Sequence, residues 1–181
     1  MDNGASSYRR FLDGDDNSLA LIIDEYYDGL TLYLNSYVRN LSIAEDLAED
    51  TFVKLVTKKP RFKGKSSFKT WLYAIGRNVA LDYLRHLSKH NTVPIDSVEE
   101  LLENEEVEDR YFKEDRKIII HQAMQKLKPE YSQALWLSYF ENLSMKEIAG
   151  VMKKSVNSAE HLVSRARISL KKELEKESFI L

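Results

Sequence analysis

Glycine and proline are scarce in this chain, which holds 6 glycines and 3 prolines in 181 residues. Leu, Glu, Lys and Ala, which favour helix, are frequent, and no segment alternates apolar and polar residues as a half-buried strand does. The length suits one large domain or two small ones. We therefore predict an all-α fold of two small helical modules, an N-terminal helical bundle and a C-terminal helix-turn-helix, joined by an acidic linker.

Turn and capping residues divide the first module into helices. One helix is expected over residues 18–38, with Gly29 as a weak point inside it. Ser42 can begin the next helix, because Glu45 follows at the spacing of a capping box. That helix should end before Pro60, since proline disfavours helix in the residue that precedes it.

The remaining boundaries separate the modules. A short basic loop at 61–67 should lead into a third helix, from Ser67 to about Ser88. An acidic stretch with little apolar periodicity follows, which is typical of a linker or a weakly packed helix. We assign the first module to 1–90, the acidic linker to 91–115 and the second module to 116–181.

The second module contains a helix-turn-helix pattern. Ser144 and Glu147 have the spacing of a capping box ahead of a short amphipathic segment. The chain then turns through Lys153 and Lys154, and Ser155 is a good N-cap for a long final helix. In DNA-binding proteins the second helix of such a pair lies in the major groove.

The final helix has two distinct faces. Spaced at 100° per residue, its apolar side chains share one face: Ala159, Leu162, Val163, Ala166 and Leu170. Mostly polar side chains lie roughly opposite: Asn157, His161, Ser164 and Ile168. A polar face suits the reading of base edges, and four cations suit phosphates: Arg165, Arg167, Lys171 and Lys172. An ordinary helical hairpin with a solvated face would show the same pattern.

Charge is segregated along the chain although the net charge is only −2. Residues 51–90 hold ten Lys or Arg and a single acid, whereas residues 91–115 hold two basic and ten acidic side chains. Aromatic side chains lie among the cations of the basic segment: Phe62, Phe68, Trp71, Tyr73 and Tyr83. Basic surfaces attract phosphate backbones and aromatic faces can stack on unpaired bases, so the pattern favours a nucleic-acid partner.

Other classes of protein find little support. The chain has no Cys, which excludes disulfides and thiolate zinc sites. His86 and His90 have the spacing of a metal pair, but no nearby acid or Cys completes a set, so we expect no metal. We find no nucleophile–base set, signal peptide or membrane span, and expect a cytoplasmic protein that is not an enzyme, with no cofactor, small-molecule substrate or membrane insertion.

Three segments carry a family resemblance in their order along the chain. They read SIAEDLAEDTFVKLV, FKGKSSFKTWLYAIGRNVALDYLR and LKPEYSQALWLSYFENLSMKEIAGVM, and SRARISLKKEL follows the last of them. Together they resemble bacterial RNA polymerase sigma factors of the extracytoplasmic-function (ECF) group, in the sigma-70 family. The resemblance implies a factor that binds core polymerase, recognises the minus-thirty-five and minus-ten promoter elements and opens the promoter.

The resemblance implies that the segment 44–56 binds the clamp helices of the polymerase. The expected contacts are Asp46, Leu47, Glu49, Asp50 and Phe52. Glu49 and Asp50 stand where a Gln-Glu pair is common, so the surface stays acidic and can orient a basic partner. Leu47 could instead be a core residue, and both roles stay open.

The resemblance also implies that the basic loop and the helix after it capture an unpaired base of the minus-ten element. The expected contacts are Arg61, Lys63, Lys65, Ser66, Lys69, Trp71, Arg77 and Asn78. Gly64 allows close approach of the backbone, and Asn78 is near enough to the loop for both to flank one extruded base. For Trp71, which shares an apolar face with Phe68, a core role is favoured. Leu81 and Leu84 lie on the opposite face, which either the fold or a partner must cover.

In the second module, the resemblance implies contacts to the minus-thirty-five element. The expected residues are Ser155, Asn157, Ser158, Glu160, His161, Ser164, Arg165 and Arg167. The family commonly has Gly where Lys153 stands and cations where Glu160 and Leu162 stand, so we expect weaker electrostatic affinity here. Glu160 could accept a hydrogen bond from a cytosine amino group, but a solvent-facing place near the helix N-terminus fits it better.

The resemblance implies three partners: core RNA polymerase, contacted at its clamp helices and flap, promoter DNA, and an anti-sigma protein wedged against the two modules. Two alternatives compete with the sigma factor. A stand-alone regulator would use its N-terminal module to sense or dimerise, and it would not need the basic, aromatic segment 61–85. A pure interaction protein would bind polymerase without reading promoters, and the divergent positions 157–162 keep that alternative open.

Overall fold

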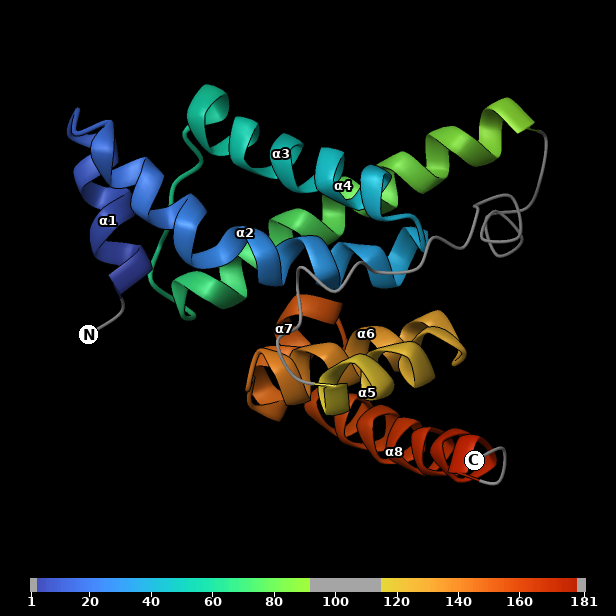
Figure 1. The fold of residues 1–181 in the computed structure, drawn as a ribbon. Coiled ribbons are helices and arrows are strands. Elements are labelled where there is room, and N and C mark those ends of the chain that lie inside the picture. The colour runs from blue at the N-terminus through green and yellow to red at the C-terminus, as the bar shows by residue number, and fades with distance from the viewer. Residues whose placement is uncertain (1–2, 92–114, 179–181) are drawn as a thin grey trace. The chain divides into compact units, whose positions relative to one another are not determined.

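The structure is a computed structural model that describes residues 3–91 and 115–178. Every regular element in these two ranges is helical, as predicted. The chain divides into two compact units, which we call unit 1 (Met1–Glu103) and unit 2 (Asn104–Leu181). Figure 1 shows their helices in the order of the chain. Most of the predicted acidic linker, residues 92–114, lies outside the described residues.

Unit 1 contains the helices α1 (Asn3–Leu12), α2 (Asn17–Val38), α3 (Leu41–Lys58) and α4 (Phe68–Asn91). The helix α1 was not predicted, because the residues around it are polar. Its apolar side chains Tyr8 and Phe11 are only 1% and 3% exposed, so packing against the rest of unit 1 stabilises this short helix.

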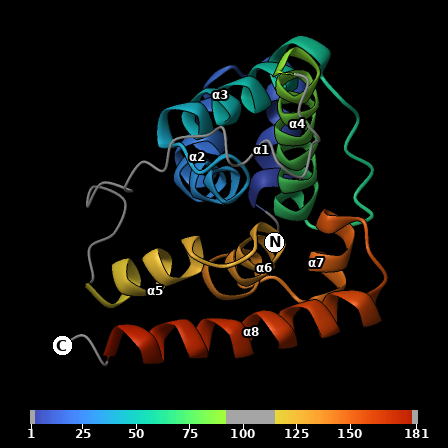
Figure 2. The same ribbon diagram turned by 90° about the vertical axis from the view of Figure 1, so that its right-hand side faces the viewer.

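The helix α2 is the centre of unit 1. It runs unbroken through Gly29, so the expected weak point does not interrupt it. Every side chain from Leu30 to Val38 is buried, and α3 and α4 both pack against this helix (Figure 2). A Cβ at Gly76 of α4 would lie 2.8 Å from the Leu30 Cδ1 atom, so this close approach of α4 to α2 depends on glycine.

The helix α3 does not begin where the sequence predicted. The Asn40 side chain accepts a hydrogen bond from the Ile43 N–H at 2.9 Å, and the helix begins at Leu41. The predicted capping box of Ser42 and Glu45 is therefore wrong. Beginning the helix at Leu41 places that buried side chain in the core, and this packing favours the earlier cap.

The other boundaries of unit 1 agree with the sequence. The helix α3 ends at Lys58, before Pro60, as predicted. The Ser67 Oγ atom accepts a hydrogen bond from the Thr70 N–H at 3.2 Å, so Ser67 caps α4, which begins at Phe68, one residue after the predicted start. The helix then continues to Asn91, slightly past its predicted end.

Unit 2 contains α5 (Asp115–Gln125), α6 (Pro129–Leu135), α7 (Met145–Met152) and α8 (Val156–Ser178). A π-helical turn, Trp136–Phe140, extends α6. The long helix α8 packs against α5, α6 and α7, and Figure 2 shows it running alongside them. Among the described residues, none of the helices is long and apolar enough to cross a membrane.

Candidate nucleic-acid and protein interfaces

The basic loop (residues 61–67) presents cations to solvent. Arg61, Lys63, Lys65 and Ser66 are all exposed. Gly64 has a φ of 65°, in the left-handed region that favours glycine, and a Cβ there would have no neighbour within 4 Å. The glycine is therefore required by the backbone turn that places a lysine on each side of it, and space remains for a ligand to approach.

Trp71 belongs to an aromatic cluster beneath this loop. Its ring centroid lies 5.2 Å from that of Phe62, 5.5 Å from Phe68 and 5.3 Å from Tyr8. Trp71 is half-buried within the cluster, which fits the core role that the sequence favoured for it. Phe62 is the one residue of the loop whose ring packs into the cluster in this way, so it ties the loop to α4.

The predicted minus-ten residues of α4 do not all share one face. Asn78 is exposed and follows Trp71 by seven residues, so the two lie almost directly in line along the helix. Arg77 precedes Asn78 by one residue, so the two side chains point about 100° apart around the helix axis. Arg77 is half-buried, and its charge opposes the rise that burial causes in the pKa of Tyr33.

Three other residues of α4 differ in their exposure to solvent. Lys69 is half-buried, unlike the exposed lysines of the basic loop. Leu84 is 6% exposed and Leu81 is half-buried, so the fold itself covers much of the second apolar side of α4.

The predicted polymerase contacts on α3 divide into exposed acids and buried apolar residues. Asp46, Glu49 and Asp50 are exposed, whereas Leu47 is 4% and Phe52 is 5% exposed. The three carboxylates thus form an acidic outer surface on α3. The two apolar side chains have core positions, yet both still line surface grooves.

These two grooves flank α3. The α2–α3 groove has a volume of about 560 Å³, and its lining is Leu19, Ile23, Tyr27, Glu49, Phe52, Val53, Val56 and Thr57. The α3–α4 groove has a volume of about 420 Å³, and its lining is Leu47, Asp50, Val53, Lys54, Val79, Asp82, Tyr83 and His86. Leu47 is a core residue that also lines the α3–α4 groove, so its burial supports the core role, and its contact with polymerase stays a prediction.

The rim of the α2–α3 groove is electronegative. Burial raises the pKa of Tyr27, and the negative charges of Glu49 and Glu45 raise it further. Val53, at the surface of α3, is 53% exposed. The α3 surface therefore combines apolar contact area with carboxylates, which suits a basic, amphipathic protein partner better than a nucleic acid.

The helix-turn-helix of unit 2 has the predicted caps. The Ser144 N–H donates to the Glu147 Oε2 atom at 2.9 Å, and the Glu147 N–H donates to the Ser144 Oγ atom at 3.3 Å. The Ser155 Oγ atom accepts from the Ser158 N–H at 3.1 Å and so caps α8. Lys153 has a φ of 53°, which explains why glycine is favoured at this turn position.

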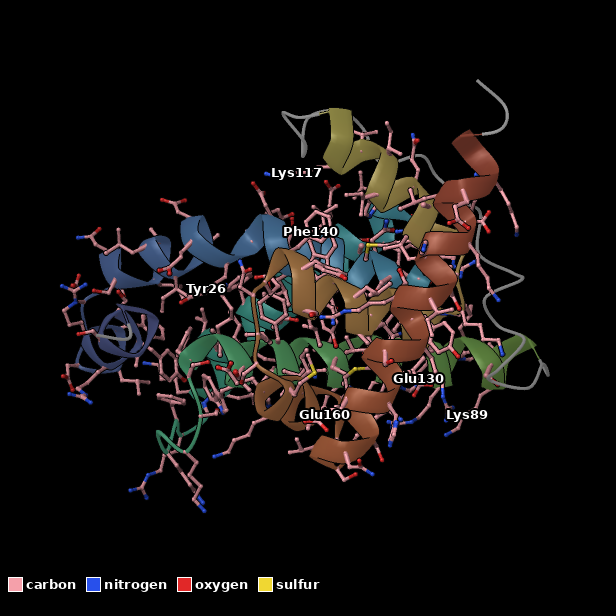
Figure 3. The ribbon with its side chains drawn as sticks, turned by 90° about the horizontal axis from the view of Figure 1, so that it is seen from below. Tyr26, Lys89, Lys117, Glu130, Phe140 and Glu160 are labelled. Atoms are coloured by element: carbon pink, nitrogen blue, oxygen red, sulfur yellow. The ribbon has the colours of Figure 1, made fainter. Side chains whose placement is uncertain are left out.

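The two faces of α8 are as predicted. All five apolar residues of its inner face are buried, and Leu162 is among them at 8% exposure. The outward residues are exposed: Asn157, Glu160, His161, Ser164, Arg165 and Ile168. Figure 3 labels Glu160 close to the N-terminal end of the helix. The change from a cation to Leu162 thus falls on the core side of α8, whereas the change to Glu160 falls on its surface.

Two cations near the helix-turn-helix have partners within unit 2. The Arg167 guanidinium carbon lies 5.4 Å from the centroid of the Tyr139 ring, a cation–π contact that directs it toward the π-helical turn. The Lys154 Nζ atom lies 2.7 Å from the Glu130 Oε1 atom. Arg165, Lys171 and Lys172 are exposed on α8 as well.

Comparison with known proteins identifies the family. Residues 22–90 match the family model for sigma-70 region 2, and residues 117–170 match that for sigma-70 region 4. RNA polymerase sigma factor YlaC of Bacillus subtilis is 31% identical over 162 residues, which cover 88% of this chain and 94% of the relative. ECF RNA polymerase sigma factor SigM of the same organism is 29% identical and covers 83% and 94%. The chain belongs to the ECF group of the sigma-70 family.

Solved structures share the fold of this ECF-group protein. The sigma factor RpoE, in complex with the anti-sigma factor NepR from Bartonella quintana, matches with a TM-score of 0.70 and 22% identity over 84% of this chain and 94% of that one. CnrH, in complex with the cytosolic domain of CnrY, matches with a TM-score of 0.66 and 19% identity over 96% of each chain.

Sequence reasoning did not find α1, the aromatic cluster or the two grooves. A weak signal for α1 exists, because Gly4, Tyr8 and Phe11 recur at helical spacing. No comparable signal marks the grooves, since their linings come from different helices.

Proposed function

We propose that this ECF-group protein is a sigma factor that binds core RNA polymerase and directs initiation at specific promoters. In this proposal, residues 1–90 bind polymerase and open the minus-ten element, residues 91–115 connect the two parts, and residues 116–181 read the minus-thirty-five element. The observation that carries the proposal is the separation of surfaces in unit 1 of a sigma-family chain. Exposed cations lie on the basic loop, and exposed carboxylates lie on α3. One unit therefore offers different surfaces to DNA and to a protein.

At the minus-ten element, the basic loop and Asn78 contact one unpaired strand. Because an α-helix rises about 1.5 Å per residue, Asn78 lies roughly 15 Å along the axis from Phe68, where α4 begins. In this proposal the loop and Asn78 contact different nucleotides of the unpaired strand, which revises the expectation from the sequence that both flank one extruded base. Lys63 and Lys65 hold the backbone, and the Asn78 amide offers a donor and an acceptor to a base edge.

At the minus-thirty-five element, the outward face of α8 enters the major groove. In this proposal Asn157, His161 and Ser164 meet base edges, and Arg165 meets phosphate. Ser155 and Ser158 contribute through the start of the helix, where the hydroxyl groups already bond to each other at 2.8 Å. Arg167 plays a lesser part, since its guanidinium lies over Tyr139.

An anti-sigma protein is a further proposed partner. The two solved structures compared above are both complexes, one with an anti-sigma factor and one with the cytosolic domain of CnrY. The acidic α3 surface and the two apolar grooves beside it offer contact area for a partner helix.

The proposal is tested by promoter opening on two kinds of template. We expect Asn78→Ala, and the double variant Lys63→Ala with Lys65→Ala, to slow opening of duplex promoters while leaving polymerase binding unchanged. The defect should shrink on templates with a bubble already melted at the minus-ten element, because the unpairing cost is then absent. Permanganate reactivity of unpaired thymines and transcript yield measure the two steps.

A matched variant controls for net charge. Lys58→Ala with Lys89→Ala also removes two exposed lysines from unit 1, but outside the basic loop. We expect this variant to open duplex promoters at nearly the wild-type rate. Wild-type kinetics in the Asn78 and loop variants would contradict their role in opening. An equal defect on duplex and bubble templates would instead assign them to docking or to a later step.

A further inference from the structure

The helix α1 packs against the base of the basic loop. It precedes residues 22–90, which match the region 2 family model. A Cβ at Gly4 would clash with the Phe68 ring and lie 2.7 Å from the Tyr26 hydroxyl oxygen, so α1 approaches the start of α4 as closely as glycine permits. The Lys59 Nζ atom lies over the Phe11 ring, 5.4 Å from the ring centroid. Figure 1 shows α1 beside the segment that joins α3 to α4.

Tyr8 joins α1 to the start of the loop. Its hydroxyl donates a hydrogen bond of 2.8 Å to the Pro60 carbonyl oxygen, across 52 residues of sequence. Its ring lies 5.6 Å from that of Phe68 and 5.3 Å from that of Trp71. Tyr8 is 1% exposed, and burial raises its pKa to about 12, so the hydroxyl keeps the proton that it donates.

The remainder of the loop is held at two more points. The Phe62 ring packs 5.7 Å from Phe68 and 5.2 Å from Trp71, and Ser67 caps α4. Only residues 63–66, which include both lysines, lie between these last two anchors. A loop whose ends are fixed before the ligand arrives loses less conformational entropy when it binds.

We propose that α1 braces the basic loop, and that Tyr8 is the positioning residue of this brace through its hydrogen bond to Pro60. The inference rests on the proposed function of the loop in promoter opening. Tyr8 is buried and does not touch DNA itself. It acts by holding the start of the loop, so that Lys63 and Lys65 meet the strand in one conformation.

The test compares two variants that each lose one buried hydroxyl. Tyr8→Phe removes the bond to Pro60 and keeps the ring. The matched control, Tyr37→Phe, removes one hydroxyl of the Tyr33–Tyr37 pair, which is bonded at 2.9 Å elsewhere in unit 1. We expect Tyr8→Phe to slow opening of duplex promoters by about threefold to tenfold, the range that corresponds to one hydrogen bond. Opening of bubble templates and binding to core polymerase should stay near wild type. Tyr37→Phe should show no defect specific to duplex templates.

Combination with the loop variant separates a positioning role from a merely structural one. If Tyr8 acts through the loop, Tyr8→Phe should have little further effect once Lys63 and Lys65 are both alanine. Equal behaviour of Tyr8→Phe and Tyr37→Phe, or additive defects in the combined variant, would overturn the brace while leaving the proposed function intact. A loop variant that opens duplex promoters at the wild-type rate would overturn the proposed role of the loop and the brace with it.

A second variant reaches the same brace from the other end of α1. Gly4→Ala displaces α1 from Phe68 but keeps the Tyr8 hydroxyl. We expect it to show the same defect, specific to duplex templates. Wild-type opening by Gly4→Ala would count against the brace, provided that thermal unfolding shows the expected loss of stability from the clash.

Discussion

Lys153, in the turn of the helix-turn-helix, has a backbone conformation that suits glycine. Its φ and ψ are 53° and 49°, and its side chain is exposed. The left-handed region costs a residue with a Cβ about 1–2 kcal/mol. Glycine avoids this cost but loses about 0.5–1 kcal/mol more backbone entropy on folding. We therefore expect Lys153→Gly to be more stable than Lys153→Ala by about 0.5–1 kcal/mol.

The alanine variant is the matched control, because both variants lose the same charge and differ only by the Cβ. Hydrogen exchange of the slowest amides in α7 and α8 of the full chain reports the stability of unit 2, and amides of α2 serve as an internal reference. A gain of 1 kcal/mol should slow exchange in unit 2 about fivefold and leave α2 unchanged. The salt dependence of DNA binding should fall equally in both variants, by at most about one unit of slope.

Equal exchange rates in the glycine and alanine variants would refute this reasoning. That result would mean that the turn does not hold position 153 in the left-handed region. A faster rate in the glycine variant would lead to the same conclusion, because glycine would then contribute only its entropic cost.

Three further predictions concern the α3 surface, the outward face of α8 and a buried histidine of unit 2. Glu49→Lys should weaken binding to core polymerase, most strongly at low salt, as measured by fluorescence anisotropy. Because the Glu49 side chain is exposed, the free energy of unfolding in urea titrations should change by less than about 0.5 kcal/mol. His161→Ala should change which minus-thirty-five sequences are selected from a random pool, whereas Lys171→Ala with Lys172→Ala should weaken binding to all of them and lower the salt slope by at most about one unit per lost contact. Burial lowers the pKa of His121 from 6.5 to about 4. The free energy of unfolding of unit 2, measured by urea titrations, should therefore fall by on the order of 3 kcal/mol as the pH is lowered from 6.5 toward 4.

Each of these predictions has a control. Asp13→Lys reverses an exposed acid of unit 1 outside α3, and a loss of polymerase binding equal to that of Glu49→Lys would contradict the α3 interface. Equal effects of the α8 variants on every DNA sequence would show that α8 does not enter the groove as proposed. For His121, the neutral form is favoured in the folded state, so stability is fully present above pH 6.5. The variant His121→Gln removes this titration and should make the stability of unit 2 less dependent on pH. An unchanged dependence would mean that other groups cause it.

Local patterns were sufficient for the helical class and for several boundaries. The caps at Ser144 and Ser155 and the end of α3 before Pro60 each depend on residues within one turn of one another. The inner face of α8 follows from helical periodicity alone, because all five of its predicted residues are buried. Such features can be predicted because the interacting groups are close along the chain.

Contacts between distant segments required the tertiary structure. The helix α1 is too short to be stable in water alone, and Tyr8 holds it against residues more than fifty positions away. The sequence predicted Ser42 as the cap of α3, whereas the helix is capped by Asn40, two residues earlier, and begins at the buried Leu41. Local rules rank each candidate cap by itself, whereas the core determines which residue of the helix must face inward.

Packing also determines how far each candidate cation is exposed to solvent. Lys63, Lys65, Arg165 and Arg167 are exposed, whereas Arg77 is half-buried, and Arg167 also makes a cation–π contact with Tyr139. All five are equally basic in the sequence. Which of them can meet a phosphate depends on the side of the helix that the core occupies and on which aromatic faces lie within reach, and only the folded chain brings those surfaces together.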